Sequence, residues 1–439
     1  MEKAYKFIVF GILIAIAGCQ LKSKKMPNLQ LDEKSKRVRD YVVKEAIIAH
    51  RGTTYWAPEE TEAAFRWARN MGADYLEVDI QRSKDGVLLA LHDNNLTRTT
   101  DCEAVFPKDS LYNAGKYTYQ ELLQLDAGSW FNKANPDQKR EAFSKAAPVT
   151  RINQKAFSFN GRDISNELDS ALAIQHPSNE IYIGGKQVIS TLEDVLMIAK
   201  GWRIAKNEKG ERLYNLIVVN SIPHYQFFYV KDDQDNGHRP GIYIETKEPD
   251  LYPHVENDLY SFLKLSGWNI AENPVKSMEA YYKNKLVNTG NTNGKIVLQT
   301  FSPKSLANLD SLFKGKVPVC FLLWLGDSNL PVADSAHYQE NINYTIQHKA
   351  HFIGPSIAGE PNNYTDLLEE WQANLIHQSG LKIHAYSFDT EWQTQHYAKR
   401  TDAMFTNRTE LTIQFYKNLG FKQDIQLNKP TETLKTLGY

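Results

Sequence analysis

Short apolar segments alternate with amphipathic segments along most of this chain. Eight apolar segments have the length of a β-strand, and most of the stretches between them repeat apolar residues at helical spacing. Strands that alternate with helices form parallel sheets, and eight such units close into a barrel. The pattern therefore predicts an α/β fold of the (β/α)₈ TIM-barrel class. The eight strand candidates are Ala46 to Ala49, Asp74 to Asp79, Gly241 to Glu245, Lys295 to Phe301, Val317 to Leu323, His351 to Pro355, Lys382 to Phe388 and Asp402 to Thr406.

Three segments between these strands carry helix signals. From Pro58 onwards apolar residues recur at helical spacing, and Gly72 ends the pattern. Ser190 to Ala199 has the sequence of a capped amphipathic helix, and Asn363 to Gln378 predicts a further helix.

A further apolar segment, Val87 to Leu91, follows the second strand too closely to be its parallel neighbour. A parallel crossover needs a dozen or more residues, and only the turn around Asp85 and Gly86 intervenes. The segment is therefore predicted to be the return arm of a hairpin. Folding the chain about this turn brings His92 back roughly opposite Asp79.

Polar side chains lie at the ends of the first two predicted strands. His50 and Arg51 come directly after the first strand, and Glu77 and Asp79 stand at i and i+2 of the second. Strand geometry points these two carboxylates to the same side, roughly 7 Å apart. Two converging carboxylates repel unless a cation lies between them, and oxygen ligands favour Ca²⁺ or Mg²⁺. Each feature alone is common on protein surfaces, but their joint occurrence at strand ends favours a catalytic or metal-binding site.

The stretch from Ile47 to Cys102 resembles the signature of the glycerophosphodiester phosphodiesterase family, which runs HRG, PE-x-T, E-x-D, DG and HD. The similarity is greatest to the larger, periplasmic-type members. Later family-like segments are LQTF at Leu298 to Phe301, HAYSF at His384 to Phe388 and MFTN at Met404 to Asn407. Two positions depart from the family pattern. Glu60 stands where many relatives have Asn, and Asn407 stands where Asp is usual, so Asn407 is not counted as functional.

The resemblance implies a set of roles for the polar residues. The implied metal ligands are Glu77, Asp79 and Glu245, which would hold one divalent cation, Ca²⁺ rather than Mg²⁺. The implied phosphate-binding residues are Arg51 and Lys247, and the implied acid–base pair is His50 and His92. The residues do not reveal which histidine is the acid, nor whether water attacks directly or a cyclic phosphate forms first.

The implied activity is hydrolysis of glycerophosphodiesters, such as glycerophosphocholine and glycerophosphoethanolamine, to sn-glycerol 3-phosphate and an alcohol. One alternative keeps the chemistry and changes the substrate to lysophospholipids or phosphoinositols. A second alternative is a non-catalytic lipoprotein that binds glycerophosphodiesters.

The N-terminus predicts a bacterial lipoprotein signal peptide over residues 1–19. Lys3 and Lys6 precede an apolar run from Phe7 to Ala17, and Gly18 and Cys19 follow as the cleavage and lipidation site. The alternative, a plain transmembrane anchor, is disfavoured because the apolar run is short. Cys19 would then anchor the chain to a membrane of the bacterial cell envelope, facing the periplasm or the outside.

The remaining chain is divided by composition. Residues 20–40 are polar and lysine-rich and predict a flexible tether. Residues 41–424 form the predicted barrel, and 132–186 are a predicted insertion over its C-terminal mouth, with a peripheral decoration as the alternative. Residues 425–439 are predicted to be a peripheral polar tail. Cys320 lies in an apolar strand and is expected in the core, and the net charge of −1 gives no support for a nucleic-acid partner.

Overall fold

The computed structural model describes residues 28–134, 158–159, 162–163, 182–219, 222–277, 279–325 and 334–439. The segment that carries the predicted signal peptide and Cys19 lies outside these residues. Among the described residues, no helix has both the length and the apolar character needed to cross a membrane.

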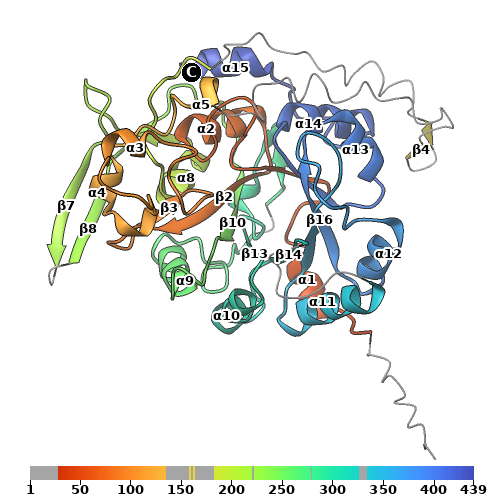
Figure 1. Ribbon diagram of the computed structural model, residues 1–439. Helices are drawn as coiled ribbons and strands as arrows, with labels where there is room; N and C mark the ends of the chain where they lie inside the picture. Colours follow the sequence, from red (N-terminus) through yellow and green to blue (C-terminus); the bar gives the residue numbers. More distant parts are fainter. Residues whose placement is uncertain are drawn as a thin grey trace, which may run out of the picture.

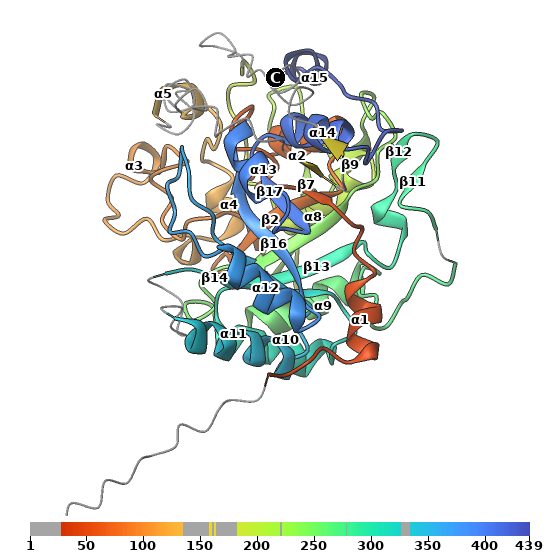
Figure 2. The same cartoon turned by 90° about the vertical axis from the view of Figure 1, so that its right-hand side faces the viewer.

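Eight parallel strands form a closed barrel, as predicted (Figures 1 and 2). Closure occurs at the first strand, where Ala49 pairs with Leu76 on one side and with Thr406 on the other. The sequence therefore identified every barrel strand, with bounds that differ by at most a few residues. In barrel order the strands are β1 (Ala46–Ala49), β2 (Tyr75–Arg82), β10 (Gly241–Thr246), β13 (Ile296–Thr300), β14 (Val319–Leu323), β15 (Phe352–Pro355), β16 (Lys382–Phe388) and β17 (Ala403–Thr406).

Helices surround the barrel, as Figure 2 shows. Apolar residues of the strands alternate between two clusters, one packed under these helices and one inside the barrel. The inner cluster includes Tyr75, Tyr243, Val297 and Cys320, so the cysteine is a core residue as predicted. The surrounding helices are α2 (Glu62–Met71), α8 (Leu192–Ala199), α9 (Val255–Leu265), α10 (Pro303–Phe313), α11 (Ser335–Gln347), α12 (Glu370–Gln378), α13 (Glu391–Tyr397) and α14 (Thr409–Asn418).

Strand β3 (Leu88–Ala90) is antiparallel to β2, which confirms the predicted hairpin. Gly86 in the turn has φ 91°, a conformation that favours glycine. Ile80 pairs with Ala90, and the Leu91 N–H donates to the Asp79 carbonyl. His92 therefore follows one residue beyond the position opposite Asp79.

The predicted helices are confirmed, but α2 begins at Glu62 rather than Pro58 and α12 also begins later than predicted. Thr61 caps α2 and Gly72 ends it, while Thr191 and Asp194 form a capping box on α8. Helix α12 begins at Glu370 rather than Asn363, because the Leu367 N–H donates to the Ser356 carbonyl and draws the preceding residues onto the end of β15.

The predicted tether is wrong for the part that the structure describes. Residues 33–39 form helix α1 (Glu33–Arg39), which Asp32 caps. Leu31 and Val38 are buried, and the Leu31 N–H donates to the Ser379 carbonyl. Lysine-rich composition suggests a tether, but Leu31 before the helix packs in the apolar core and Val38 within it is buried. Of the proposed tether, residues 20–27 are not among the described residues.

The C-terminal segment is not peripheral. Residues 430–437 form helix α15 (Pro430–Leu437), which packs against α2. Leu434 and Leu437 are buried at helical spacing, and Arg66 of α2 donates to the Tyr439 hydroxyl over 2.7 Å. The prediction of a peripheral tail rested on the polar composition of this segment, which did not reveal the narrow apolar face of α15 that packs against α2.

The predicted insertion falls mostly outside the described residues. At its ends, the rings of Phe131 and Tyr182 lie 5.4 Å apart, and Tyr182 stacks on Tyr439. These ends therefore attach beside α15, while the position of the insertion over the barrel mouth stays a prediction.

The smaller elements lie outside the barrel sheet proper. The helices are α3 (Cys102–Val105), α4 (Tyr119–Leu122) and α5 (Phe131–Ala134), with 3₁₀ turns at Ala114–Lys116 and Thr289–Asn291. The strands are β4 (Ser158–Phe159), β5 (Arg162–Asp163), β6 (Trp202–Ile204), β7 (Tyr214–Val219), β8 (Ile222–Phe227), β9 (Tyr229–Lys231), β11 (Tyr282–Lys283) and β12 (Leu286–Val287).

Candidate active site

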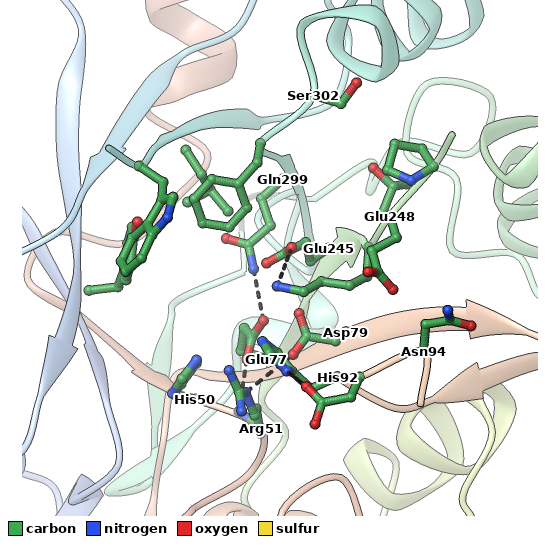
Figure 3. Close-up of a pocket in the computed structure, with 18 of the residues that line it drawn as sticks. His50, Arg51, Glu77, Asp79, His92, Asn94, Glu245, Glu248, Gln299 and Ser302 are labelled. Atoms are coloured by element: carbon green, nitrogen blue, oxygen red, sulfur yellow. Dashed lines mark hydrogen bonds and ion pairs between the residues drawn. The ribbon is translucent and has the colours of Figure 1, made fainter. Parts of the chain in front are cut away.

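A cavity of about 760 Å³ opens at the C-terminal ends of the barrel strands (Figure 3). Alternate residues of each strand point into the barrel. Near the start of the strands these inward residues are apolar, whereas near the C-terminal ends they include carboxylates and an amide, which form the polar base of the cavity. All seven residues that the sequence singled out line this cavity: His50, Arg51, Glu77, Asp79, His92, Glu245 and Lys247.

The three predicted metal-ligand carboxylates lie on two neighbouring strands. Glu77 and Asp79 lie at alternate positions within β2, and Glu245 on β10 is the register partner of Asp79. All three are buried. Burial and the charge of Asp79 raise the pKa of Glu77 well above its usual value, and burial raises the pKa of Glu245 to about 8. Buried carboxylates in this arrangement are unfavourable without a neighbouring positive charge.

Glu60 belongs to this group, although the sequence analysis treated it only as a departure from the family pattern. Carboxylate oxygens of Glu60, Glu77 and Asp79 lie within 4.8 Å of one another. Glu60 Oε1 accepts from the Asp79 N–H over 2.9 Å, while its buried Oε2 has no hydrogen-bond partner among the described residues. In the sequence, the only indication of a role for Glu60 is its place as the second acidic residue of the PEET motif.

Glu245 lies slightly apart from this tight group. Its Oε1 is 3.1 Å from the Lys247 ammonium, so part of its charge is already neutralised. Glu60, Glu77 and Asp79 consequently form the centre of a possible cation site, with Glu245 beside Asp79 on the neighbouring strand. A set of buried oxygen donors, one of them unpartnered, fits a hard divalent cation.

Arg51 is held by three acidic residues. Its N–H donates to Glu77 Oε2 over 2.8 Å, its Nη1 donates to Glu59 over 3.1 Å, and its Nε lies 3.3 Å from Asp79. Gly52 follows with φ 77°, and a Cβ there would lie 2.8 Å from the backbone of Ala64. The glycine of HRG therefore leaves room for α2 to pack against the loop that carries Arg51.

His50 is oriented by Asn407, which departs from the family pattern and is not predicted to be functional. Asn407 Oδ1 lies 2.8 Å from His50 Nδ1, and its Nδ2 donates to Asp389 over 2.6 Å. Because the amide nitrogen is committed to a carboxylate, the amide oxygen faces His50 and accepts its Nδ1–H. His50 Nε2 then carries the free lone pair. Burial and the charge of Arg51 lower the pKa of His50 to about 4.

His92 is linked to Arg51 through a chain of charged groups. Its Nδ1 contacts Asp93, whose other oxygen accepts from Arg98, and Arg98 also donates to Glu59. Glu59 in turn accepts from Arg51. Burial lowers the pKa of the His92 imidazole well below its usual value, with Arg51 and Lys247 adding to the effect. Both histidines line the same cavity.

Gln299 is a further site residue that the sequence analysis did not select. Its Nε2 donates to Glu77 Oε1 over 2.8 Å, and its buried Oε1 has no hydrogen-bond partner among the described residues. It lies on β13 beside Glu245 in register. The only signal for it in the sequence was its place in the LQTF segment.

The rest of the cavity wall consists of two chemically different parts. One part is aromatic and apolar, and the other is polar and acidic. The apolar part comprises Phe301, Leu322, Trp324, Tyr364, Tyr386 and Phe405, and the polar part comprises Asp93, Asn94, Asn95, Glu248, Asp250 and Ser302. Such a wall suits a substrate with a polar end and a less polar end.

Comparison with known proteins shows which family this chain resembles. The profile of the glycerophosphoryl diester phosphodiesterase family matches residues 50–220. A glycerophosphodiester phosphodiesterase of Bacillus subtilis (strain 168) is 25% identical over 344 residues, which cover 78% of this chain and 76% of that protein. The human glycerophosphoinositol inositolphosphodiesterase GDPD2 is 35% identical over 169 residues, which cover 36% of this chain and 30% of that protein.

A solved structure supports the fold independently. A crystal structure from Silicibacter pomeroyi DSS-3, named for the same activity, superposes with a TM-score of 0.53 at 13% identity. The match covers 88% of this chain and 98% of that one, and it concerns the fold alone. The profile and the sequence relatives bear out the resemblance of this chain to the glycerophosphoryl diester phosphodiesterase family, whose enzymes are phosphoric diester hydrolases.

Proposed function

We propose that the protein hydrolyses glycerophosphodiesters, such as glycerophosphocholine and glycerophosphoethanolamine, to sn-glycerol 3-phosphate and the free alcohol. The observation that carries this proposal is the placement of His50 and His92 in one cavity with Arg51 and the buried carboxylates. That arrangement offers proton transfer, phosphate binding and a cation site within reach of a single phosphodiester.

Glu60, Glu77 and Asp79 would hold one divalent cation, with Glu245 as a further ligand. When bound, the cation withdraws charge from the phosphoryl oxygens. Several carboxylates in one site suit Ca²⁺ better than Mg²⁺, because Mg²⁺ retains most of its waters and uses only one or two carboxylates.

Arg51 and Lys247 would neutralise the phosphate. The Arg51 guanidinium presents several donors at fixed angles and is already held in position by Glu59 and Asp79. The Lys247 ammonium lies 5.3 Å from the centre of the Phe301 ring, which keeps it at the cavity wall. Both cations are therefore in place before the substrate binds.

The two histidines differ in their partners, and this difference supports a separate role for each. Asn407 accepts the Nδ1–H of His50 and leaves Nε2 as a free base, which would take the proton of the attacking oxygen. Asp93 is a carboxylate and stabilises the protonated form of His92, which would give its proton to the leaving alkoxide. The attacking oxygen belongs either to water or to a glycerol hydroxyl that first forms a cyclic phosphate.

The test is release of sn-glycerol 3-phosphate from glycerophosphocholine by EDTA-treated protein before and after addition of Ca²⁺ or Mg²⁺. Release that requires a cation would support the reaction, the cleaved bond and the cofactor together. Parallel assays with lysophosphatidylcholine and glycerophosphoinositol test the alternative substrates. No product from any of these substrates would contradict the proposal and favour the binding lipoprotein.

We also propose that the chain is anchored to the bacterial cell envelope through lipidated Cys19. The support is the order of Lys3, Lys6, the apolar run and the cysteine within residues 1–19. Metabolic labelling with palmitate in cells that express the protein, compared with the Cys19→Ser variant, tests this location.

A further inference from the structure

Exposed apolar side chains concentrate in one part of the molecule. Of the thirteen large apolar side chains that are exposed among the described residues, six lie between Leu213 and Val230. We call these six the hairpin patch: Leu213, Leu216, Ile217, Val218, Phe228 and Val230. An apolar cluster of this kind on a water-exposed surface usually marks an interaction site.

The patch lies on and beside a two-stranded ribbon formed by β7 and β8. Within the described residues these strands pair only with each other, and Figure 1 shows the ribbon extending away from the body of the barrel. Its base is fixed, because the Tyr225 hydroxyl donates to Asp85 over 2.6 Å and the Phe227 ring packs 5.4 Å from Tyr119. The ribbon is thus held by the same β2–β3 turn that leads to His92.

Both faces of the ribbon carry exposed apolar side chains towards its end, although exposed His224 pairs with Ile217 on one of them. Leu216, Ile217 and Val218 are consecutive, so their side chains alternate between the two faces. They are nevertheless all exposed, by 42%, 50% and 63% respectively. A folded partner protein that packs on one face would leave the other in water, whereas the apolar phase of a lipid bilayer covers both.

The order of residue types along the ribbon also fits a membrane interface. Residues 213–230 contain no Asp, Glu, Lys or Arg. Aliphatic residues occupy the outer part of β7, while Tyr214, Tyr225, Phe227 and Tyr229 lie towards the base. Aromatic residues favour the headgroup region and aliphatic residues the acyl chains. The unpaired outer edges of two strands allow only shallow insertion.

We propose that the hairpin patch inserts into the interface of a lipid bilayer. The inference rests on the proposed envelope location, because the N-terminal segment would hold the chain at such a surface, but it does not require the proposed hydrolase activity. Since the ribbon base contacts the β2–β3 turn, insertion would also fix the orientation of the catalytic cavity relative to the lipid.

The test places a fluorescent NBD label on the ribbon of the full-length chain. Cys19→Ser prevents lipidation, and Cys102 and Cys320 are buried, so Ile217→Cys provides a single accessible thiol. The matched control is Leu265→Cys on α9, a residue that is 89% exposed and remote in sequence from the ribbon. Both proteins retain the same N-terminal apolar segment, so binding through that segment is common to both.

Vesicles of phosphatidylethanolamine and phosphatidylglycerol with brominated acyl chains are then added. We expect a blue shift and quenching at position 217, and unchanged emission at position 265. Unchanged emission at 217, whether or not the protein sediments with the vesicles, would overturn the proposal. Equal quenching at both positions would also overturn it, because it would indicate non-specific adsorption.

A second variant separates insertion from folding. Ile217→Asn combined with Val218→Asn should lower vesicle binding by about tenfold or more, because two aliphatic side chains no longer leave water. Its melting temperature should match that of wild type, as should that of the control Leu265→Asn. A concentration-dependent dimer in lipid-free solution that only the double variant abolishes would instead assign the patch to self-association and refute membrane insertion.

Discussion

The amide oxygen of Asn407 lies 2.8 Å from Nδ1 of His50, although 357 positions separate the two residues in the sequence. The amide N–H of Asn407 already donates to Asp389, so the amide oxygen accepts from His50. The contact therefore fixes the tautomer of His50 with its proton on Nδ1. Asn407 is therefore a positioning residue for the proposed catalytic base, and its role is testable.

Asn407→Ala should lower kcat by about tenfold to a hundredfold with little change in KM, because His50 loses its orientation but the substrate contacts remain. Asn407→Asp combined with Asp389→Asn should recover much of kcat, since a carboxylate also accepts the Nδ1–H and the second change restores its hydrogen-bond partner. It should also move the acidic limb of the pH–rate profile upwards, because a nearby negative charge raises the pKa of an imidazole. Equal losses in both variants would show that Asn407 has only a structural role.

The assignment of acid and base predicts different responses to the leaving group. His92→Ala should lower turnover of glycerophosphocholine by about 10²–10⁴, and most of this loss should disappear with the p-nitrophenyl ester of glycerol 3-phosphate. A p-nitrophenolate ion departs without a proton, so it does not need the general acid. His50→Ala should be impaired on both substrates. The reverse pattern would exchange the two roles.

Gln299 should tune cation binding through Glu77. Gln299→Met keeps the side-chain volume but removes the amide that donates to Glu77 Oε1. Outer hydrogen-bond partners of metal ligands typically contribute tenfold to a hundredfold to metal affinity. We expect the Ca²⁺ concentration for half-maximal activity to rise by about tenfold. A fall in kcat without any change in this concentration would place Gln299 on the substrate instead.

Glu60 should contribute to cation binding even though relatives often carry Asn there. In wild type, saturating Ca²⁺ should raise the melting temperature, because a ligand that binds only the folded state stabilises it. Glu60→Gln should reduce this increase, since one of the oxygen donors within 4.8 Å loses its charge. Glu248→Gln is the control, because Glu248 lines the same cavity but lies outside that group. Equal effects of the two substitutions would argue against a role for Glu60.

His351 should make the protein sensitive to acid. It is buried, its Nδ1 accepts the Val319 N–H over 3.1 Å, and burial lowers its pKa to about 3. The unfolded chain takes up this proton near pH 6.5, so between pH 6.5 and 3 the unfolded state binds more protons. Stability then falls as the pH is lowered, by up to about 1.4 kcal/mol per pH unit for one such group.

His351→Asn keeps the acceptor for Val319 and removes the titrating group. Urea unfolding at pH 7.5 and 5.5, with the cation saturating, should therefore show a smaller loss of stability in the variant. His224→Asn is the control, because His224 is exposed on β8 and lies in water in both states. A loss in His351→Asn as large as in wild type would contradict this account.

Much of the site could be predicted because its parts are local. The hairpin that carries His92 follows from a turn of a few residues, and the structure places His92 within one residue of the expected register. Glu77 and Asp79 share a side because strand geometry alternates strictly. These relations depend on short-range backbone geometry, which sequence patterns report well.

Other parts were missed because local composition is a poor guide to packing. Helices α1 and α15 lie in polar segments, yet α1 buries Val38 and α15 buries Leu434 and Leu437. Asn407 was judged by its departure from a family pattern, whereas its contact with His50 decides its role.

The sequence by itself determined the eight-stranded barrel, the order of its strands and the residue types at their ends, because apolar periodicity and turn signals act over a few residues. Only the tertiary structure decided which of those residues meet. Closure of the barrel brings β17 beside β1, and with it Asn407 onto His50, while β13 carries Gln299 to Glu77 across 222 positions. Such pairings depend on the curvature and register of the whole sheet, which no local segment of the chain encodes.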